Sequence, residues 1–256
     1  MTSSRPATGP PIPLILTSLL RADFFVFSKN RRVLLLSTLL PVFLLVTTNS
    51  SKAVQHFGGA AFVVGLAIAY GLAATSILGY ALTVARDREQ GVFQRLRVTP
   101  APTWTIMSSR LAMQVIANLV IALVVVIIGT RMHHLSPSAG QYGLVLLVSI
   151  LGGAVFLSIG QALVGLVKSA DAVNAVGRII FIALVVLASL GASGALGSLW
   201  ESIARWTPIG LVMTLFAGVL DLSAWASRDT LAVVVSVAYI VVFAGIGIRW
   251  FQWDAR

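Results

Sequence analysis

The chain has 256 residues, of which 58% are hydrophobic and only 10% are charged, and its formal net charge is +10. A soluble domain carries roughly 25% charged residues, so this composition cannot cover a water-exposed surface and indicates that a bilayer surrounds most of the chain. No nucleic-acid-binding module accompanies the positive charge, and the absence of cysteine excludes disulfides and Cys-ligated metals.

The N-terminal region divides into a tail and an amphipathic segment. Residues 1–12 are rich in Ser, Thr, Pro and Gly, which predicts a disordered tail. In residues 13–32, Ser18, Arg21 and Ser28 fall on one polar stripe of a helix, and apolar side chains cover the opposite side. This pattern predicts a helix that lies in the cytoplasmic interface of the membrane.

Six apolar segments predict an all-α integral membrane protein with six transmembrane helices, in which residues 13–256 form one transmembrane domain. The predicted spans are residues 33–48, 58–85, 104–130, 142–167, 179–190 and 230–248. A charged loop at 86–103 separates the second span from the third. Residues 191–229 are half apolar but interrupted by Gly and Pro, which predicts a re-entrant, extracytoplasmic helical segment before the last span.

The distribution of basic residues predicts the orientation in the membrane. With the N-terminus inside, 14 of the 18 Lys and Arg residues lie in the inner segments and four lie in the outer segments. Cytoplasmic loops of membrane proteins carry an excess of Lys and Arg. We therefore expect a multi-pass protein of the cell membrane with both termini in the cytoplasm.

One segment resembles the nucleophile motif of rhomboid intramembrane proteases. Residues 191–194 read Gly-Ala-Ser-Gly, which would present Ser193 as the nucleophile. A serine needs a base within hydrogen-bond reach, and in rhomboids that histidine comes from a later helix. The three histidines of this chain, His56, His133 and His134, all precede Ser193. A serine protease is therefore an unfavourable alternative, because no histidine follows Ser193 to act as its base.

Two further motifs fail as ligand sites. Residues 160–169 approach a phosphate-binding loop, but two apolar residues separate the second glycine from Lys168 and no strand precedes the segment. His133 and His134 are adjacent, so their side chains point to different sides, and no carboxylate lies nearby in the sequence. We expect no catalytic residue, metal site or cofactor in this chain.

Several polar residues within the predicted spans are candidates for a translocation path. A polar side chain in lipid faces either a neighbouring helix or a cavity, so interhelical hydrogen bonds are the alternative. No span has an acidic residue near its centre, which argues against a proton- or sodium-coupled carrier. The path candidates are Thr75, Gln114, Asn118, Ser158, Gln161 and Asn174.

The loop at residues 86–103 combines a polar run with an amphipathic stretch. Residues 86–90 are all polar, and Phe93 and Leu96 then form an apolar side opposite Arg95 and Arg97. The pattern predicts a short helix at the cytoplasmic surface, between two spans. It is either a solvated segment that supplies positive charge or a lever that docks onto a cytoplasmic partner.

In this loop, Glu89 and Gly91 are followed by Leu96-Arg97 and Pro100, and here the chain resembles the membrane subunits of type-2 ABC exporters. The likeness extends to the interfacial helix, the six spans, the broken segment before the last span and a basic, aromatic C-terminus. The outer segment of this chain departs from the family pattern in one respect. The family often has a proline shortly after the Ser-Gly pair, and here no proline closely follows Ser193-Gly194.

The resemblance implies the permease subunit of an ATP-driven exporter, without an ATPase site of its own. Its implied partners are two copies of a cytoplasmic ABC ATPase, which bind ATP and Mg, and a second permease, either the same chain or a sister subunit. The implied ATPase-coupling residues are Arg86, Asp87, Arg88, Glu89, Gly91, Phe93, Arg95, Leu96 and Arg97.

The apolar spans favour a hydrophobic or amphipathic substrate, such as a drug, an antibiotic or a lipid. Polysaccharide or glycolipid export by the same family is the alternative, and a membrane assembly protein without transport activity is a further one.

Overall fold

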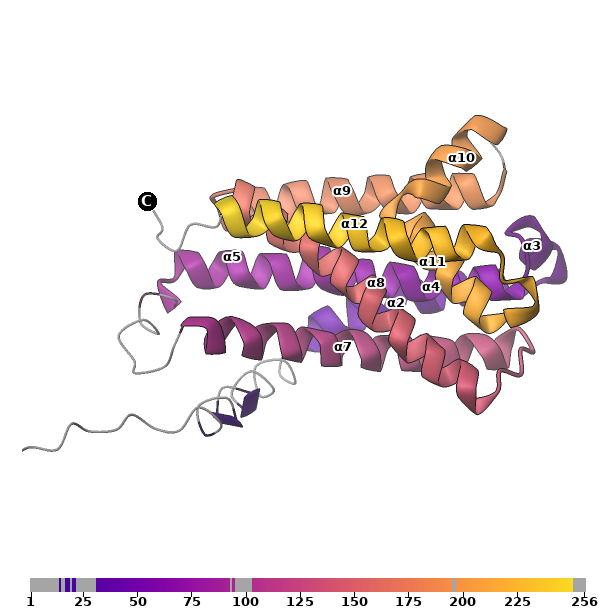
Figure 1. Cartoon of the computed structure of the whole chain (residues 1–256), viewed down its shortest axis with the longest axis horizontal. Coiled ribbons are helices and arrows are strands. Elements are labelled where there is room, and N and C mark those ends of the chain that lie inside the picture. Colours follow the sequence, from indigo (N-terminus) through magenta and orange to yellow (C-terminus); the bar gives the residue numbers. More distant parts are fainter. Residues whose placement is uncertain are drawn as a thin grey trace, which may run out of the picture.

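The computed structural model describes residues 31–92, 94, 103–194 and 197–250, together with positions 14, 17, 18, 20 and 21. Within these ranges the chain is helical and contains no strand. Most helices run roughly parallel to one long axis, as Figure 1 shows. The predicted tail and most of the predicted interfacial helix lie outside the described residues, as does the middle of the charged loop.

The described residues form a series of helical elements along the chain. A π-helical segment, η1, is continuous with α4 and α5, so these three form a single long rod. The bounds are α2 (Arg31–Thr47), α3 (Ser51–His56), α4 (Ala60–Ala73), η1 (Ala74–Tyr80), α5 (Ala81–Glu89), α7 (Thr103–Met132), α8 (Ala139–Leu166), α9 (Ala170–Ala192), α10 (Ser198–Trp206), α11 (Pro208–Leu220), the 3-10 turn η2 (Leu222–Ala224) and α12 (Ser227–Trp250).

The rod Ala60–Glu89 forms the centre of the bundle. In the most apolar 18-residue stretch of the rod, 83% is buried in the protein. In the most apolar stretches of α9 and α12, only 17% is buried. Large apolar side chains such as Ile182 and Val241 are therefore exposed on the outer helices. A water-soluble protein does not leave such continuous apolar faces uncovered. The fold is that of an all-α integral membrane protein, as the composition predicts.

In the described part of the chain, five helices are long and apolar enough to cross a bilayer, and the bent pair α10–α11 would make a sixth. They are Ala60–Glu89, Ser108–Met132, Ala139–Leu166, Ala170–Ala192 and Ser227–Trp250. The helix at the predicted first span, α2, contributes a shorter apolar stretch, Thr38–Thr47. The assignment of α2 as a span and of α10–α11 as re-entrant stays a prediction.

Two helices extend beyond the spans that the sequence predicts. The second long helix does not end at residue 85, because α5 continues to Glu89 and includes the first residues of the predicted loop. The helix predicted at 179–190 begins already at Ala170, where Ser169 caps it and Asp171 lies in its first turn. Charged residues near the membrane surface are typical of turns between spans, but a helix can also continue beyond the bilayer when its end is capped.

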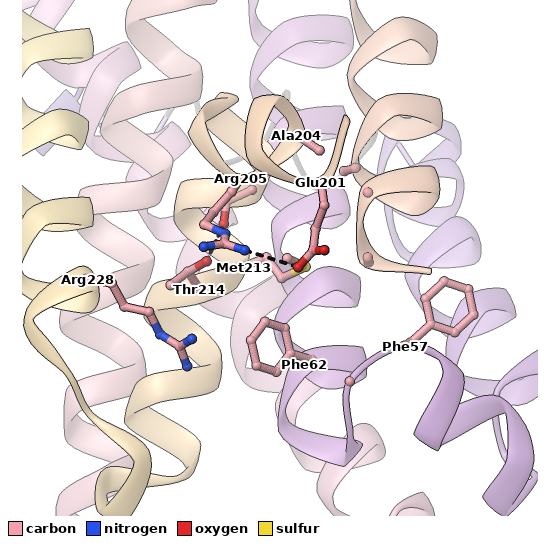
Figure 2. A pocket seen from close by; sticks show the side chains of 13 residues that line it. Phe57, Phe62, Glu201, Ala204, Arg205, Met213, Thr214 and Arg228 are labelled. Carbon is pink, nitrogen blue, oxygen red and sulfur yellow. Dashed lines mark hydrogen bonds and ion pairs between the residues drawn. The ribbon is translucent and has the colours of Figure 1, made fainter. Parts of the chain in front are cut away.

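The segment between α9 and α12 makes a sharp corner. Helices α10 and α11 meet at an angle of 86°. Thr207 Oγ1 accepts a hydrogen bond from the N–H of Gly210 at 3.2 Å, and Pro208 occupies the first turn of α11. A Cβ atom at Gly210 would overlap the carbonyl oxygen of Ala204, so the corner requires glycine there. The corner borders a cavity, which Figure 2 shows from close by.

Candidate functional site

The candidate site is the end of α5, where three consecutive residues each contact a different helix. Asp87 faces α7, Arg88 binds the end of α8, and Glu89 binds the start of α9. This is the base of the charged loop for which the family resemblance predicts a coupling role. In Figure 1 it lies at the same end of the bundle as the end of α12.

Arg88 closes the C-terminal end of α8. Its side chain is buried, with 4% exposure. Nη1 donates to the carbonyl oxygen of Val164 at 2.8 Å, and Nη2 donates to those of Val167 at 2.8 Å and Lys168 at 2.5 Å. The last carbonyls of a helix have no partner within the helix, and they carry the negative end of its dipole. A guanidinium satisfies both needs with one side chain.

Glu89 makes the complementary contact at the start of α9. Its Oε1 accepts a hydrogen bond from the backbone N–H of Ala170 at 2.6 Å. Ser169 Oγ accepts a second one from the N–H of Ala172 at 3.2 Å. A carboxylate at a helix N-terminus satisfies a free N–H and interacts favourably with the positive end of the dipole. The last residue of α5 thereby positions α9.

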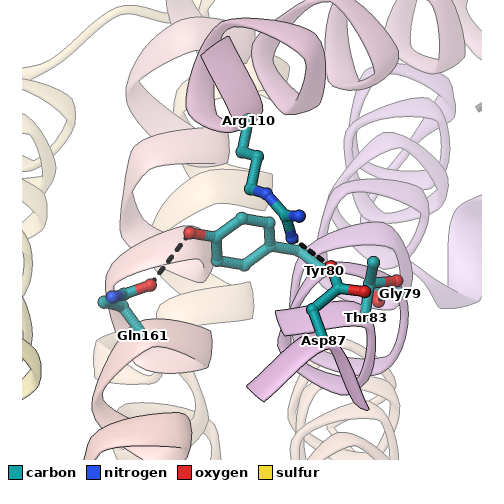
Figure 3. Close-up of polar contacts among 6 residues, drawn as sticks. All are labelled: Gly79, Tyr80, Thr83, Asp87, Arg110 and Gln161. Carbon is teal, nitrogen blue, oxygen red and sulfur yellow. Dashed lines mark hydrogen bonds and ion pairs between the residues drawn. The ribbon is translucent and has the colours of Figure 1, made fainter. Parts of the chain in front are cut away.

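Asp87 forms an ion pair with Arg110 of α7, drawn in Figure 3. Only 21% of the Asp87 side chain and 15% of the Arg110 side chain are exposed. Earlier in the same rod, the hydroxyl of Tyr80 donates to Oε1 of Gln161 on α8 at 2.9 Å. Polar contacts thus connect this part of the rod to both α7 and α8.

Of the other predicted coupling residues, Arg86 is exposed at the end of α5. Gly91 has φ of 67°, a left-handed conformation that side-chain-bearing residues rarely adopt, so the chain turns away from the helix there. Phe93, Arg95, Leu96 and Arg97 lie outside the described residues. Contact of any of these residues with an ATPase stays a prediction.

Three of the predicted path residues belong to one buried cluster between η1 and α7. Thr75 Oγ1 donates to Asn118 Oδ1 at 2.7 Å, and Gln114 Nε2 donates to the same oxygen at 3.2 Å. Asn118 Nδ2 donates to Ser76 Oγ at 3.3 Å. Asn118 is 1% exposed. In this conformation the cluster joins two helices, which is the alternative to a path lining that the sequence leaves open.

The remaining path candidates lie elsewhere. Ser158 Oγ donates to the carbonyl oxygen of Val155 in its own helix at 2.7 Å. Gln161 accepts the Tyr80 hydrogen bond described above. Asn174 is half-buried on α9 and takes part in none of these hydrogen bonds. Among these hydrogen bonds, only those of Thr75, Gln114 and Asn118 join path candidates to one another.

Sequence reasoning missed Tyr80, Arg110 and Ser76 as members of these clusters. Arg110 carried a detectable signal, because opposite charges at the adjoining ends of two consecutive helices, Asp87 and Arg110, are well placed to pair. Ser76 and Tyr80 lie in the π-helical segment, whose register the sequence does not reveal. π-Helical insertions are frequent at functional sites.

Ser193, the serine of the protease-like motif, is the C-cap residue of α9. Its Oγ donates to the carbonyl oxygen of Leu190 at 3.0 Å. This is a local bond of a helix end, and a nucleophilic serine would instead donate to a base. Among the described residues, no group of three or more His, Cys, Asp or Glu residues could hold a metal ion.

Comparison with known proteins adds one match. A family model described as "ABC-2 family transporter protein" matches residues 29–249. No curated protein sequence matches the chain. The family match covers every helix described above except the last residue of α12.

Proposed function

The chain belongs to the ABC-2 transporter family, and from this membership we propose that it is the membrane-spanning permease subunit of an ATP-driven exporter. Its substrate is hydrophobic or amphipathic and leaves the cytoplasm or the inner leaflet. Separate ATPase subunits bind ATP and Mg and supply the energy. A second permease, identical or related, completes the membrane part.

The observation that supports this proposal best is the junction at the end of α5. A coupling segment transmits force only if its base is fixed to the helices that must move. Asp87, Arg88 and Glu89 connect this base to α7, α8 and α9. A displacement of residues 90–102 by a cytoplasmic partner therefore reaches all three helices and the central rod together.

The distribution of charge supports an orientation with this junction in the cytoplasm. Arg86, Lys168 and Arg249 belong to the end of the bundle that carries the junction. Basic residues concentrate on the cytoplasmic side of membrane proteins. Trp200, Trp206 and Trp225 belong to the opposite end and are exposed, as aromatic residues are at a membrane interface.

The proposal is tested by co-purification of the chain with its ATPase. We expect a complex that hydrolyses ATP, and a weaker complex when Arg86→Glu or Arg95→Glu reverses a charge of the coupling segment. Arg131→Glu, an exposed arginine at the other end of α7, is the matched control. A complex that survives both charge reversals, or ATP hydrolysis by the isolated chain, would contradict the proposal.

Two alternatives are distinguishable. Polysaccharide or glycolipid export uses the same ATPase coupling, so transport assays with the two classes of substrate decide between them. Intramembrane proteolysis by Ser193 is disfavoured, since its hydroxyl donates to a carbonyl of its own helix. Ser193→Ala is expected to leave transport and ATPase coupling intact.

A further inference from the structure

A groove of about 470 Å³ lies between α9 and α12, next to the α10–α11 corner. It shares no lining residue with the cavity of Figure 2. Ile159 of α8 lines it between the two helices, and Ile180 and Phe243 belong to its walls. None of the described residues that line it is charged. Its volume is in the range of sites for small apolar ligands, roughly 300–1,000 Å³.

The groove lies at the depth of the hydrocarbon core of the bilayer. Tyr239, which lines it, is 12 residues after Ser227 and 11 before Trp250, in the middle of α12. Ile180 is likewise near the middle of α9. A helix of this length is about 36 Å long, and the hydrocarbon core is about 30 Å thick. Because water is not available at that depth, an apolar group must fill the groove.

The hydroxyl groups of the lining are already in use. The hydroxyl of Tyr239 donates to the carbonyl oxygen of Trp206 at 3.2 Å, at the end of α10. Thr207 Oγ1 donates to the carbonyl oxygen of Ala204 at 2.6 Å and accepts from the N–H of Gly210 at 3.2 Å. An unpaired carbonyl would be costly in hydrocarbon, and Tyr239 satisfies one. The lining therefore offers apolar contacts rather than hydroxyl groups.

The shape of the groove distinguishes a flexible occupant from a rigid one. Trp206 and Pro208 of the α10–α11 corner border one end of it, where the two helices meet at 86°. A transmembrane helix is about 10–12 Å wide and rigid, so the corner would obstruct it, whereas a flexible acyl chain can end there. Ile182 of α9 and Val242 of α12 are exposed. The groove is therefore continuous with the apolar faces that bilayer lipids cover.

We propose that this groove binds one acyl chain of a membrane phospholipid, which contacts Ile159, Leu184 and Phe243 and ends at the α10–α11 corner. The bound chain fills the space between α9 and α12 and connects both helices with the corner. Because the lining carries no charge, binding depends on the chain and not on the head group. The site is additional to the proposed export function and requires no ATPase.

The test uses the purified full-length chain in a neutral maltoside detergent, washed free of bound lipid. The probe is a phosphatidylcholine with a photoactivatable diazirine in one acyl chain, and labelled peptides are identified by mass spectrometry. We expect saturable labelling of the segments that contain Leu184 and Phe243. Little labelling is expected at Phe43 and Val46 of α2, which are exposed and apolar but do not line the groove. Unlabelled phosphatidylcholine and phosphatidylglycerol should compete equally.

Three variants give the test its specificity. Leu184→Trp and Ile180→Trp each place an indole in the groove and should lower labelling about tenfold or more, because the chain then fits only by displacing packed side chains. Ile182→Trp, at an exposed position of the same helix, is the matched control and should label like the unmodified chain. Added phosphatidylcholine should raise the melting temperature of the unmodified chain and of Ile182→Trp, but not that of Leu184→Trp.

Several results would overturn the proposal. They are equal labelling of Leu184→Trp and the unmodified chain, labelling spread evenly over α2, and competition by only one of the two phospholipids. A dimer with unlabelled groove segments would show that a second copy of the chain covers the groove instead. If Leu184→Trp aggregates in size-exclusion chromatography, Ile180→Trp and the labelled positions in the unmodified chain decide. Because neither ATPase nor transport is measured, failure here leaves the proposed export function standing.

Discussion

Arg88 and Glu89 are neighbours in the sequence, but they bind the opposite ends of two different helices. The guanidinium of Arg88 donates to carbonyl oxygens in the last turn of α8 and directly after it, while the carboxylate of Glu89 accepts from the first N–H of α9. Each charge has the sign that its helix end favours. The turn at residues 167–169 is thereby held from both sides by the end of α5.

Removal of the Arg88 side chain should destabilise the protein more than any change at its neighbour Arg86. Arg88→Ala removes the donor from three carbonyl oxygens, of which that of Val164 is buried, and each hydrogen bond to a charged group contributes about 1.5–3 kcal/mol. Arg88→Lys should retain part of the stability. Thermal denaturation followed by size-exclusion chromatography measures the difference. Arg86→Ala, at an exposed position, is the matched control, and equal melting temperatures of the two alanine variants would refute the capping role.

Glu89→Ala should separate ATPase binding from transport. The substitution removes the acceptor for the N–H of Ala170, so α9 loses its tie to the coupling segment. We expect the ATPase to co-purify as before, while substrate-stimulated ATP hydrolysis falls severalfold. Glu89→Gln keeps an oxygen acceptor and should behave nearly like the unmodified chain. If Glu89→Ala instead abolishes the complex and Glu89→Gln does too, Glu89 contacts the ATPase directly.

A double-mutant cycle on Asp87 and Arg110 should give a favourable coupling energy of about 1 kcal/mol or more. Both side chains are largely buried, so water screens their attraction less than that of an exposed pair. The cycle compares Asp87→Asn, Arg110→Gln and the double variant by unfolding in denaturant. The exposed pair Glu201–Arg205 provides the comparison, and we expect its coupling to be smaller. Coupling energies in the reverse order would show that the Asp87–Arg110 contact is not maintained.

Asn118→Leu should lower stability by about 1–3 kcal/mol, because it leaves Thr75, Ser76 and Gln114 without their shared partner. Substrate preference should stay unchanged if the cluster serves only to join η1 and α7. Stability and a transport assay with several substrates measure the two effects. Asn174→Leu, outside the cluster, is the control for replacing a half-buried amide. Altered substrate preference with unchanged stability would instead place Asn118 on the translocation path.

The sequence alone determined the class of the protein and the order of its helices. Composition requires a bilayer as the solvent, and apolar runs of helical length can satisfy their backbone only as helices. The coupling segment, which the family resemblance implies, stays a prediction. Helix ends were harder to predict, because the span predicted at residues 179–190 belongs to a helix, α9, that begins at Ala170.

The pairing of side chains from different helices depends on the tertiary structure. Arg88 lies 76 residues from Val164, and Glu89 lies 81 residues from Ala170. Contacts over such separations depend on how the rod packs against α8 and α9, and on the register that η1 introduces. The same applies to the cavity at the α10–α11 corner, which residues of α4, α9, α10, α11 and α12 line together. Local sequence sets hydrogen bonding within each helix, whereas side-chain partners between helices are set by packing across the whole bundle.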